Sequence, residues 1–334
     1  MMDLTYEKQF TSVYQQYRDA PTAIREAMCL RVIYPALLPP IEEDDYFAGR
    51  ALTMEWKGVG FTPDVTLFSL PHGMGYFYRE SVFEEALAQC GDNRAEAEEI
   101  QHLMTFWRQE NTTAKVKNAY TPSIREALPS DSFAGDVGVG FPLYRMTGAY
   151  ENYEKLIRAG IPGLEAKVRA KAVAAQGEQI AFYQGLLTVL DILRESCAHY
   201  AAQAKEMASA AEPKRRQRLL AMAADLQILL EKAPETMNQA IQLSWLYSCL
   251  AGVMDYGRMD VYLGDFLACD LADGTLDEAA AQEAVCGLWR MMVARKTVYH
   301  GRVVIGGMGR ANEKNADHFA LLAMEASRIV HDIE

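Results

Sequence analysis

Residues 256–266, YGRMDVYLGDF, place three charged side chains, Arg258, Asp260 and Asp265, among apolar residues. They follow APETMNQAIQLSWLYSCLAGVM (residues 233–254), whose second half is apolar on nearly all sides of a helix and is expected in the protein interior. Charges beside a buried helix need partners, so the first interpretation of Arg258 and Asp260 is a structural ion pair. The alternative is that the Arg258 guanidinium holds a substrate carboxylate in a two-pronged fork.

Helical patterns account for most of the chain around this segment. Residues 152–230 are rich in Ala, Leu, Glu, Lys and Gln, with apolar residues at helical spacing, and predict amphipathic helices. Residues 273–296 predict another helix, which opens with Thr275 and Glu278 in the spacing of a capping box. Three basic residues at the start of one helix are expected to form a solvated face: Arg215, Arg216 and Arg218.

A short strand is predicted between the last two helices. Residues 303–305, VVI, form a β-branched run that ends at Gly306 and Gly307, after which a helical pattern resumes. A short apolar strand between helices is typical of a parallel sheet covered on both faces. The pattern therefore predicts an α/β fold with an excess of helix.

Composition excludes several classes of partner. The 334-residue chain has a formal net charge of −12 and a pI of 5.1, whereas nucleic acids and acidic membranes are bound by basic faces. No stretch is long and apolar enough to span a membrane, and the charged N-terminus lacks the apolar core of a signal peptide, so we expect a cytoplasmic protein. The six cysteines show neither a CxxC pair nor zinc spacing and are expected to be reduced thiols.

The glycine turn at residues 306–309 invites a phosphate-binding interpretation, because main-chain amides at a helix N-terminus favour anions. Its spacing argues against a nucleotide, since Asn312 stands where a dinucleotide fingerprint requires a third glycine and no P-loop lysine follows. The six histidines show no metal-ligand spacing, so we expect no metal site. His300 carries more weight than the others because it precedes the predicted strand, where its position in the chain favours a cavity.

Several segments in register resemble the glycyl radical enzymes, the family of pyruvate formate-lyase and the related radical dehydratases. The similarity rests on GR…DVYL, on the D…G.L…EA step into the next helix, and on the strand that ends in IGGMG, in this order and spacing. It extends backward through ETMNQAIQ, YQGLLTVLDILRESCAHYA, YRMTGAYENYEKLIRAGIPGL and NAYTPSIREAL, and fades before about residue 100. Five of the matching residues are interpreted as a structural family motif: Arg258, Asp260, Tyr262, Gly306 and Gly307.

The resemblance implies a ten-stranded α/β barrel made of two five-stranded halves. Because members of the family are roughly twice as long, residues 1–334 would form an incomplete domain, with residues 111–334 as a half-barrel surrounded by helices. Residues 1–110 would be an N-terminal part without a clear assignment. The family's glycyl radical and radical cysteine both lie beyond the point that matches Glu334, so neither Gly306 nor any of the six cysteines is expected to carry a radical.

The resemblance also implies two substrate-binding residues. Arg145, in YRMTGAY, is similar to the arginine with which pyruvate formate-lyase grips a substrate carboxylate. His300 stands where that enzyme has an active-site tryptophan, and an imidazole that can donate or accept a proton there suggests a different substrate. No residue of this chain is assigned to catalysis itself.

Two functions follow from these patterns. The first is the N-terminal portion of a glycyl radical enzyme, truncated or split, which resembles a lyase or a formate C-acetyltransferase and would be inactive without a C-terminal half. Its partners would be a small-molecule substrate such as a carboxylate, a C-terminal half chain or a second copy, and a radical-SAM activating enzyme, with no cofactor bound to this chain. The second is a non-catalytic binding or scaffold protein derived from the family. A half-barrel exposes strand edges and apolar surface, which favours association in either case.

Overall fold

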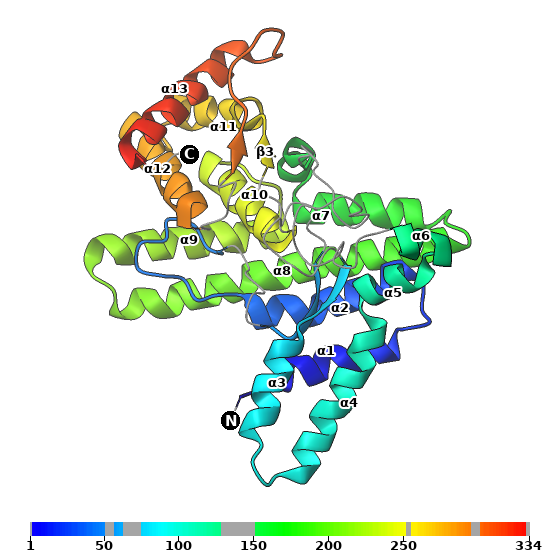
Figure 1. The fold of residues 1–334 in the computed structure, drawn as a ribbon. Helices are drawn as coiled ribbons and strands as arrows, with labels where there is room; N and C mark the ends of the chain where they lie inside the picture. The colour runs from blue at the N-terminus through cyan, green and yellow to red at the C-terminus, as the bar shows by residue number, and fades with distance from the viewer. Residues whose placement is uncertain are drawn as a thin grey trace. The chain divides into compact units, whose positions relative to one another are not determined.

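The computed structural model describes residues 2–50, 57–62, 75–127, 151–251, 255–294 and 301–331. In these residues the chain forms thirteen helices and four strands (Figure 1). The chain divides into two compact units. The predicted boundary between the N-terminal part, residues 1–110, and the half-barrel, residues 111–334, stays a prediction. The first unit comprises Met1–Leu37, Thr53–Thr147 and Gln176–Val189, and the second comprises Leu38–Leu52, Gly148–Ala175 and Leu190–Glu334.

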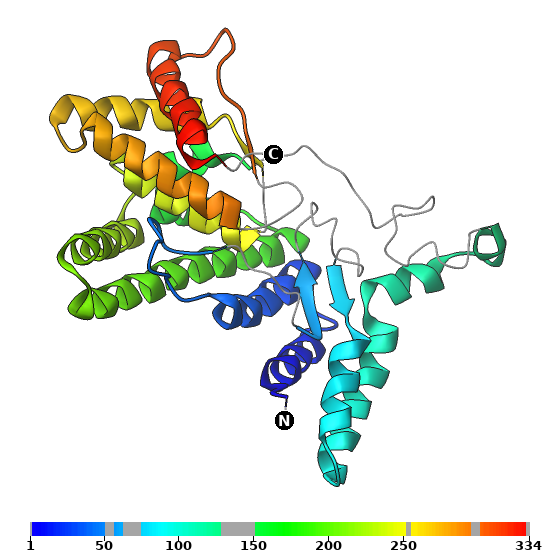
Figure 2. The same ribbon diagram turned by 60° about the vertical axis from the view of Figure 1, so that its left-hand side comes forward.

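In its described residues the first unit contains helices of up to 17 residues, together with the start of α8 (Glu178–Ala210), and one pair of antiparallel strands (Figure 2). Val59 of the first strand lies opposite Tyr78 of the second, and Thr62 lies opposite Gly75. In chain order the elements are α1 (Thr5–Gln16), α2 (Thr22–Leu37), β1 (Val59–Thr62), β2 (Gly75–Tyr78), α3 (Glu80–Gln89), α4 (Arg94–Glu110), α5 (Thr112–Ala119) and α6 (Pro122–Ala127).

Aromatic side chains from α1, α4 and β2 form the core of the first unit. The rings of Phe10 and Tyr14 lie 5.8 and 5.0 Å from the ring of Trp107, and Tyr76 meets Tyr14 edge-on at 4.7 Å. The Trp107 indole N–H donates to Thr11 Oγ1 at 2.8 Å, which satisfies a polar group that would be costly to bury alone. These contacts join helices that are far apart in the sequence, in the N-terminal part that the sequence left without a clear assignment.

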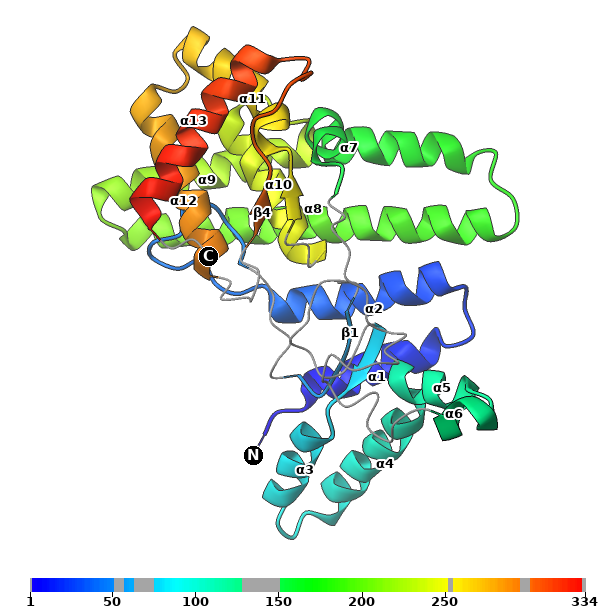
Figure 3. The ribbon, with the colours of Figure 1, turned by 45° about the horizontal axis from the view of Figure 1, so that its top comes forward.

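The second unit is dominated by helices, as its sequence predicts (Figure 3). The amphipathic helices expected within residues 152–230 are confirmed as α7, α8 and α9, of which α8 runs through both units. No helix in the described parts of the chain is long and apolar enough to cross a membrane. The elements are α7 (Tyr153–Ala172), α8 (Glu178–Ala210), α9 (Pro213–Glu231), α10 (Met237–Ala251), β3 (Asp255–Gly257), α11 (Met259–Asp273), α12 (Glu278–Ala294), β4 (Arg302–Val303) and α13 (Glu313–Val330).

Helix α10 lies in the interior, which confirms the prediction from its apolar pattern. Its polar side chains are buried with the apolar ones, including Gln239, Gln242 and Ser244. Each of them has a hydrogen-bond partner; Ser244 Oγ, for example, donates to the Ala240 carbonyl at 2.8 Å within the helix itself. Most buried polar groups in proteins are paired in this way, but the Asn238 Oδ1 atom of the same helix is buried with no hydrogen-bond partner in the described residues.

Strands β3 and β4 run parallel, with Asp255 opposite Arg302 and Gly257 opposite Val303. The Val304 N–H continues the pairing with a hydrogen bond to the Gly257 carbonyl at 2.8 Å. The parallel strand pair and the helix-rich α/β fold are therefore present in the described residues. The expected burial of the strand is wrong, because Arg302 and Val304 are both exposed.

Two local predictions in the second unit are also wrong. Helix α12 begins at Glu278, and Asp277 Oδ1 accepts a hydrogen bond from the Ala280 N–H at 2.7 Å. Asp277, and not Thr275, is therefore its N-cap, because the turn after α11 extends to residue 276 before the new helix starts. The basic cluster on α9 is a solvated face only at Arg216, which is exposed, whereas Arg215 and Arg218 are half-buried and donate to main-chain carbonyls of residues 42–46.

Candidate functional site

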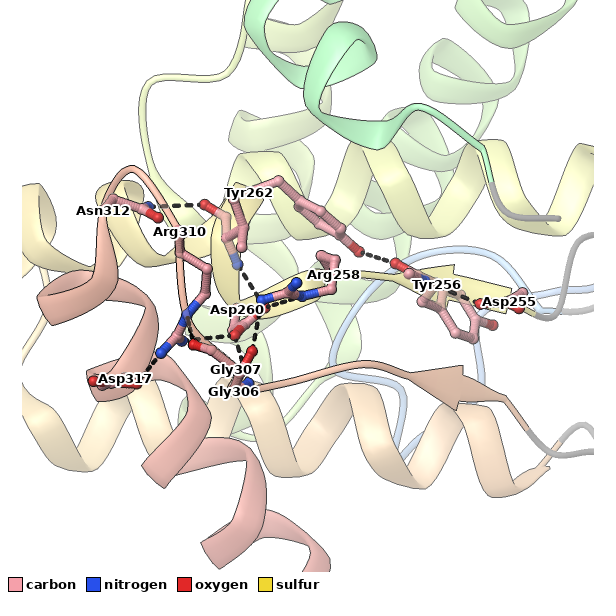
Figure 4. A network of polar contacts seen from close by, with 12 residues as sticks. Asp255, Tyr256, Arg258, Asp260, Tyr262, Gly306, Gly307, Arg310, Asn312 and Asp317 are labelled. Carbon is pink, nitrogen blue, oxygen red and sulfur yellow. Dashed lines mark hydrogen bonds and ion pairs between the residues drawn. The ribbon is translucent and has the colours of Figure 1, made fainter. Parts of the chain in front are cut away.

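The residues predicted as substrate contacts, Arg145 and His300, lie outside the described residues and stay predictions. The predicted family motif is described in full. Although 48 positions separate Arg258 from Gly306, the structure brings the motif's residues together where β3, β4, α11 and α13 meet (Figure 4). The members that share this place are Arg258, Asp260, Tyr262, Gly306 and Gly307.

Asp260 is the centre of the site. It lies in the first turn of α11, where the helix dipole favours a negative charge, and its side chain is fully buried. Its Oδ1 accepts a hydrogen bond from the Val261 N–H at 2.9 Å, and its Oδ2 accepts one from the Gly306 N–H at 2.8 Å. Arg310 Nη1 donates to the same Oδ2 at 3.0 Å. One carboxylate thus joins the start of α11 to the end of β4 and the loop after it.

Two arginines surround the Asp260 carboxylate. Arg258 Nη2 donates to the Gly306 carbonyl at 2.6 Å, while its Nε lies 3.5 Å from Asp260 Oδ1, at the limit of a hydrogen bond. Arg310 is nearly buried and donates from all three nitrogens, through Nε to the Gly307 carbonyl and through Nη2 to Asp317. The structure therefore places Arg258 in an ion pair and a main-chain contact within the protein.

Tyr262 stabilises the strand side of the site. Its hydroxyl donates to the Tyr256 carbonyl at 3.0 Å, and its ring lies 5.5 Å from the ring of Tyr153 on α7. Burial raises the pKa of Tyr262 well above its ordinary value, with smaller contributions from Tyr256 and Asp260. The hydroxyl therefore remains protonated at neutral pH and acts as a donor.

The glycine turn after β4 uses its amides on the chain's own carboxylates. Gly306, Gly307 and Gly309 all have positive φ values between 78° and 89°, a backbone conformation that other residues adopt with strain. The Gly306 N–H donates to Asp260, and the Gly309 N–H donates to Glu313 Oε1 at 2.8 Å. These two amides, which in a phosphate-binding turn could bind an anion, already have internal partners.

A second cluster joins α11 to α13 one turn further along. Asp265 Oδ1 accepts hydrogen bonds from Asn312 Nδ2 and Asn315 Nδ2, each at 2.9 Å, and Arg158 lies 3.6 Å from Oδ2. Partial burial opposes ionisation of Asp265, but these donors outweigh it and hold its pKa below the ordinary value. The helices approach so closely here that a Cβ on Gly264 would lie 2.8 Å from α13 main-chain atoms.

The sequence pattern missed Arg310, Asn312 and Asn315. They fall in RANEKN, directly after the glycine turn, where polar residues are ordinarily taken as a solvated helix start. The signal that could have found Arg310 is the buried charge of Asp260, because a buried carboxylate requires a cation. Arg258 approaches only the Oδ1 atom, so the Oδ2 atom needs a second cation, which Arg310 supplies.

The geometry of the site therefore suits the positioning of strands and helices and not proton transfer. Both Asp260 oxygens already accept hydrogen bonds from the protein, and the surrounding donors are committed to the glycine turn and to the strands. The described residues contain no group of three or more histidine, cysteine, aspartate or glutamate side chains that could hold a metal ion. The network fixes the carboxyl ends of the parallel strands β3 and β4 against the helices α11 and α13.

Comparison with known proteins gives a family match over almost the whole chain. The family described as "Pyruvate formate lyase-like" matches residues 3–334, which includes the N-terminal part where the sequence motifs fade. A probable dehydratase, YbiW, from Escherichia coli K12 is 23% identical over 321 residues, covering 87% of this chain and 37% of the relative. The (2S)-3-sulfopropanediol dehydratase of Klebsiella oxytoca is 26% identical over 299 residues, covering 82% and 34%.

A third relative is an isethionate sulfite-lyase from Oleidesulfovibrio alaskensis, 23% identical over 331 residues, with 89% of this chain and 38% of the relative covered. Among solved structures, a glycyl radical enzyme from Archaeoglobus fulgidus superposes with a TM-score of 0.72 at 19% identity, covering 100% of this chain and 45% of that one. The B12-independent glycerol dehydratase of Clostridium butyricum gives 0.69 at 17% identity, covering 96% and 43%. The chain thus spans about a third of the length of these curated relatives and less than half of these structures, an extent consistent with an N-terminal half.

Proposed function

Since the chain belongs to the pyruvate formate lyase-like family, we propose that it supplies the N-terminal portion of a glycyl radical enzyme of the dehydratase or lyase type. The observation that carries the proposal is the family match from residue 3 to residue 334. Its relatives are named for the loss of water or of sulfite, which favours an elimination over an acyl transfer.

In such an elimination, a hydrogen atom passes from one carbon of the substrate to a cysteine thiyl radical, water or sulfite leaves the adjacent carbon, and the hydrogen atom then returns to the product radical. The glycyl radical supplies the unpaired electron that starts this chemistry. We place that radical and its relay cysteine on a C-terminal portion, in the same gene or in a separate chain, that a radical-SAM enzyme activates. The part left to this chain, in the cytoplasm, is to position the substrate and to exclude water from it.

The described strand pair fits a place in the proposed barrel. Strands β3 and β4 are parallel neighbours, and each is followed by a helix, as adjacent strands of an α/β barrel are. Asp260 bonds to the Gly306 N–H where β4 gives way to the glycine turn, so the carboxyl ends of both strands are held at one place. We interpret this pair as part of a five-stranded half-barrel within residues 111–334.

The proposed substrate contacts are Arg145 and His300. A guanidinium at position 145 could hold a carboxylate through two parallel hydrogen bonds, and an imidazole at position 300 could donate or accept a proton. His300 precedes β4 by two residues in the sequence, and the far end of that strand is held by the Asp260 network. The pocket would thus be supported by a strand whose position is fixed.

Anaerobic reconstitution tests the proposal. The chain is co-expressed with the C-terminal portion encoded downstream and with the neighbouring activating enzyme, and the glycyl radical is measured by EPR spectroscopy. We expect a radical signal, together with elimination from a vicinal diol or a hydroxysulfonate. A folded complex without a radical, or a downstream sequence with neither an RVxGY loop nor a radical cysteine, would contradict the proposal and leave the binding or scaffold function.

Arg145→Lys tests the proposed carboxylate contact. Lysine keeps the charge but cannot form the bidentate fork, so affinity for a carboxylate ligand should fall by about tenfold or more while the melting temperature changes little. Isothermal titration and thermal unfolding measure the two effects. Arg169→Lys is the matched control, because Arg169 is exposed and pairs with Glu165 on its own helix. Equal losses of affinity and stability would mark Arg145 as structural.

A further inference from the structure

Residues 38–50, LPPIEEDDYFAGR, form an irregular segment, the strap, that contains no helix or strand and turns at residues 42–45, where the Asp45 N–H donates to the Glu42 carbonyl at 3.2 Å. The strap belongs to the second unit, although the residues before and after it, Met1–Leu37 and Thr53–Thr147, belong to the first. In Figure 1 it is the blue coil that passes beside α9. It is therefore held by side chains of α8, α9 and α10, with Gly287 of α12 close to Tyr46, and not by secondary structure of its own.

Side chains of the second unit bind the strap almost entirely through its main chain. The hydrogen bonds recur every few residues, and each uses a main-chain N–H or carbonyl of the strap. They are the Tyr200 hydroxyl to Pro39 O (3.0 Å), Ile41 N to Gln203 Oε1 (3.0 Å), Arg215 to Glu42 O and Asp45 O (2.6 Å each), Arg218 Nε to Tyr46 O (2.9 Å), Gln242 to both Ala48 N and O (2.8 and 2.9 Å), and the Trp245 indole to Gly49 O (2.7 Å).

One strap side chain occupies a shaped slot. The Arg218 guanidinium lies 3.6 Å from the centroid of the Tyr46 ring, a close cation–π contact. On α12, a Cβ on Gly287 would lie 2.4 Å from the Tyr46 Cβ, so the slot exists only because residue 287 has no side chain. Tyr46 therefore has the geometry of an anchor residue in a peptide-binding groove.

The strap is acidic and α9 is basic, but in the described residues the hydrogen bonds from the α9 arginines to the strap go to carbonyl oxygens and not to carboxylates. Asp45 is buried and its carboxylate binds Arg50 within the strap at 2.6 Å. The α9 arginines are thus left to donate to carbonyl oxygens, while the acidic run of residues 42–45 supplies a favourable field around them. Recognition therefore combines the strap's main chain, a negative charge, the Tyr46 ring and the buried side chains of Ile41 and Phe47, of which Phe47 also lies 5.4 Å from the Arg218 guanidinium.

We propose that the surface of α8, α9, α10 and α12 is a recognition groove for an acidic peptide that follows the strap's backbone path and carries its tyrosine anchor, occupied in this chain by its own strap. The groove meets the requirements of such a site, since its donors are spaced along the backbone and its slot takes one aromatic ring. The covalently attached strap has a high effective concentration and keeps a free peptide out. Loosening the strap should make the same groove available to that peptide in trans.

A binding assay on the full chain tests this inference. A fluorescent peptide of residues 38–50 is titrated against the wild type and against Tyr46→Ala, which loosens the strap but leaves every groove residue in place. Fluorescence anisotropy should show saturable binding to Tyr46→Ala, and at least tenfold weaker binding to the wild type. Binding should also fall at least tenfold when the peptide itself carries Tyr46→Ala, or when the groove carries Arg218→Met in the Tyr46→Ala background.

Hydrogen exchange controls for folding and for strap release. In Tyr46→Ala the strap amides should exchange at least tenfold faster, while the amides of α11 and α13 keep wild-type rates. Gly49→Ala provides a second loosened strap, because Gly49 has a φ of +96° and an added Cβ would lie 3.0 Å from Leu246. The inference is overturned if the strap loosens in either folded variant and the peptide still does not bind, if Arg218→Met leaves binding unchanged, or if neither substitution loosens the strap.

Discussion

Asp260 and Glu7 are both buried carboxylates, one in each compact unit, but their partners differ. Asp260 accepts two main-chain hydrogen bonds and an ion pair with Arg310, so both of its oxygens are satisfied. Glu7 Oε1 accepts a hydrogen bond from the Gly58 N–H at 3.0 Å, whereas its Oε2 is buried with no hydrogen-bond partner in the described structure.

This difference separates two roles for a buried charge. Burial raises the pKa of Glu7, and the hydrogen bond from Gly58 and the charge of Lys57 offset this effect only in part. A satisfied carboxylate such as Asp260 can hold several elements together, while a half-satisfied one opposes its own ionisation. We therefore expect the first to be structurally necessary and the second to weaken the fold at neutral pH.

The largest effect is expected from Asp260→Asn. The substitution removes the negative charge and leaves the nearly buried Arg310 beside a neutral amide, which should cost about 3–5 kcal/mol of unfolding free energy. Urea unfolding measures the loss, and hydrogen exchange should show it in α11 and α13. An unfolding free energy within about 1 kcal/mol of wild type would contradict the role assigned to the network.

Gly264→Ala tests the close helix crossing on which the Asp260 network depends. An added Cβ would lie 2.8 Å from main-chain atoms of Asn315 and Ala316, so α11 and α13 must separate, at a cost of about 1–3 kcal/mol in the free energy of unfolding. Gly163→Ala is the matched control, because its Cβ would meet only Ala159 at 3.4 Å. That control should leave stability unchanged or raise it by about 0.5–1 kcal/mol, because alanine favours helix.

The sequence predicted the parts of this fold that depend on local pattern. The apolar run of residues 241–251 predicted a buried helix, and the β-branched run at 303–305 predicted a strand of a parallel pair. Both predictions rest on the types and spacing of residues that are consecutive in the sequence. The resemblance also grouped Arg258 with Gly306 before any contact between them was known.

What the sequence could not supply were contacts between distant residues. The partners of Arg215 and Arg218 lie about 170 positions away in the strap, so a basic cluster was read as a solvated face. The core around Trp107 joins α1 to α4 across 96 positions, and no local pattern marks it. Such pairings are set by tertiary packing, which overrides local propensity.

Glu7→Gln tests whether the buried Glu7 carboxylate, unlike that of Asp260, makes the unfolding free energy depend on pH. The folded-state pKa of Glu7 lies above its unfolded value of 4.5, so its contribution to stability is present below pH 4.5 and is lost as pH rises through the raised pKa. Glutamine keeps an acceptor for Gly58 and does not ionise. The unfolding free energy of Glu7→Gln relative to wild type should therefore increase from pH 4.5 to 7, by about 1.4 kcal/mol for each unit by which the pKa is raised.

Urea unfolding of both proteins at several pH values measures this difference. Lys57 and Asp3 are charged groups that act on Glu7, and both are retained in the comparison. Glu99→Gln is the control, because Glu99 forms an exposed pair with Lys8 and should change stability by less than about 0.5 kcal/mol at each pH. A difference that stays constant with pH would mean that Glu7 is not held in an environment that opposes its charge.

The smallest effect is expected from Asp317→Asn, which removes the outer partner of the same arginine that Asp260 binds. Asp317 is 61% exposed, so water replaces most of what its carboxylate gives to Arg310 at 2.6 Å, and the unfolding free energy should fall by about 0–1 kcal/mol. Salt should reduce this loss further, whereas the loss from Asp260→Asn should persist, because a buried pair is screened much less. If Asp317→Asn costs as much as Asp260→Asn, then Arg310 is held from the surface and the buried carboxylate is not the centre of the network.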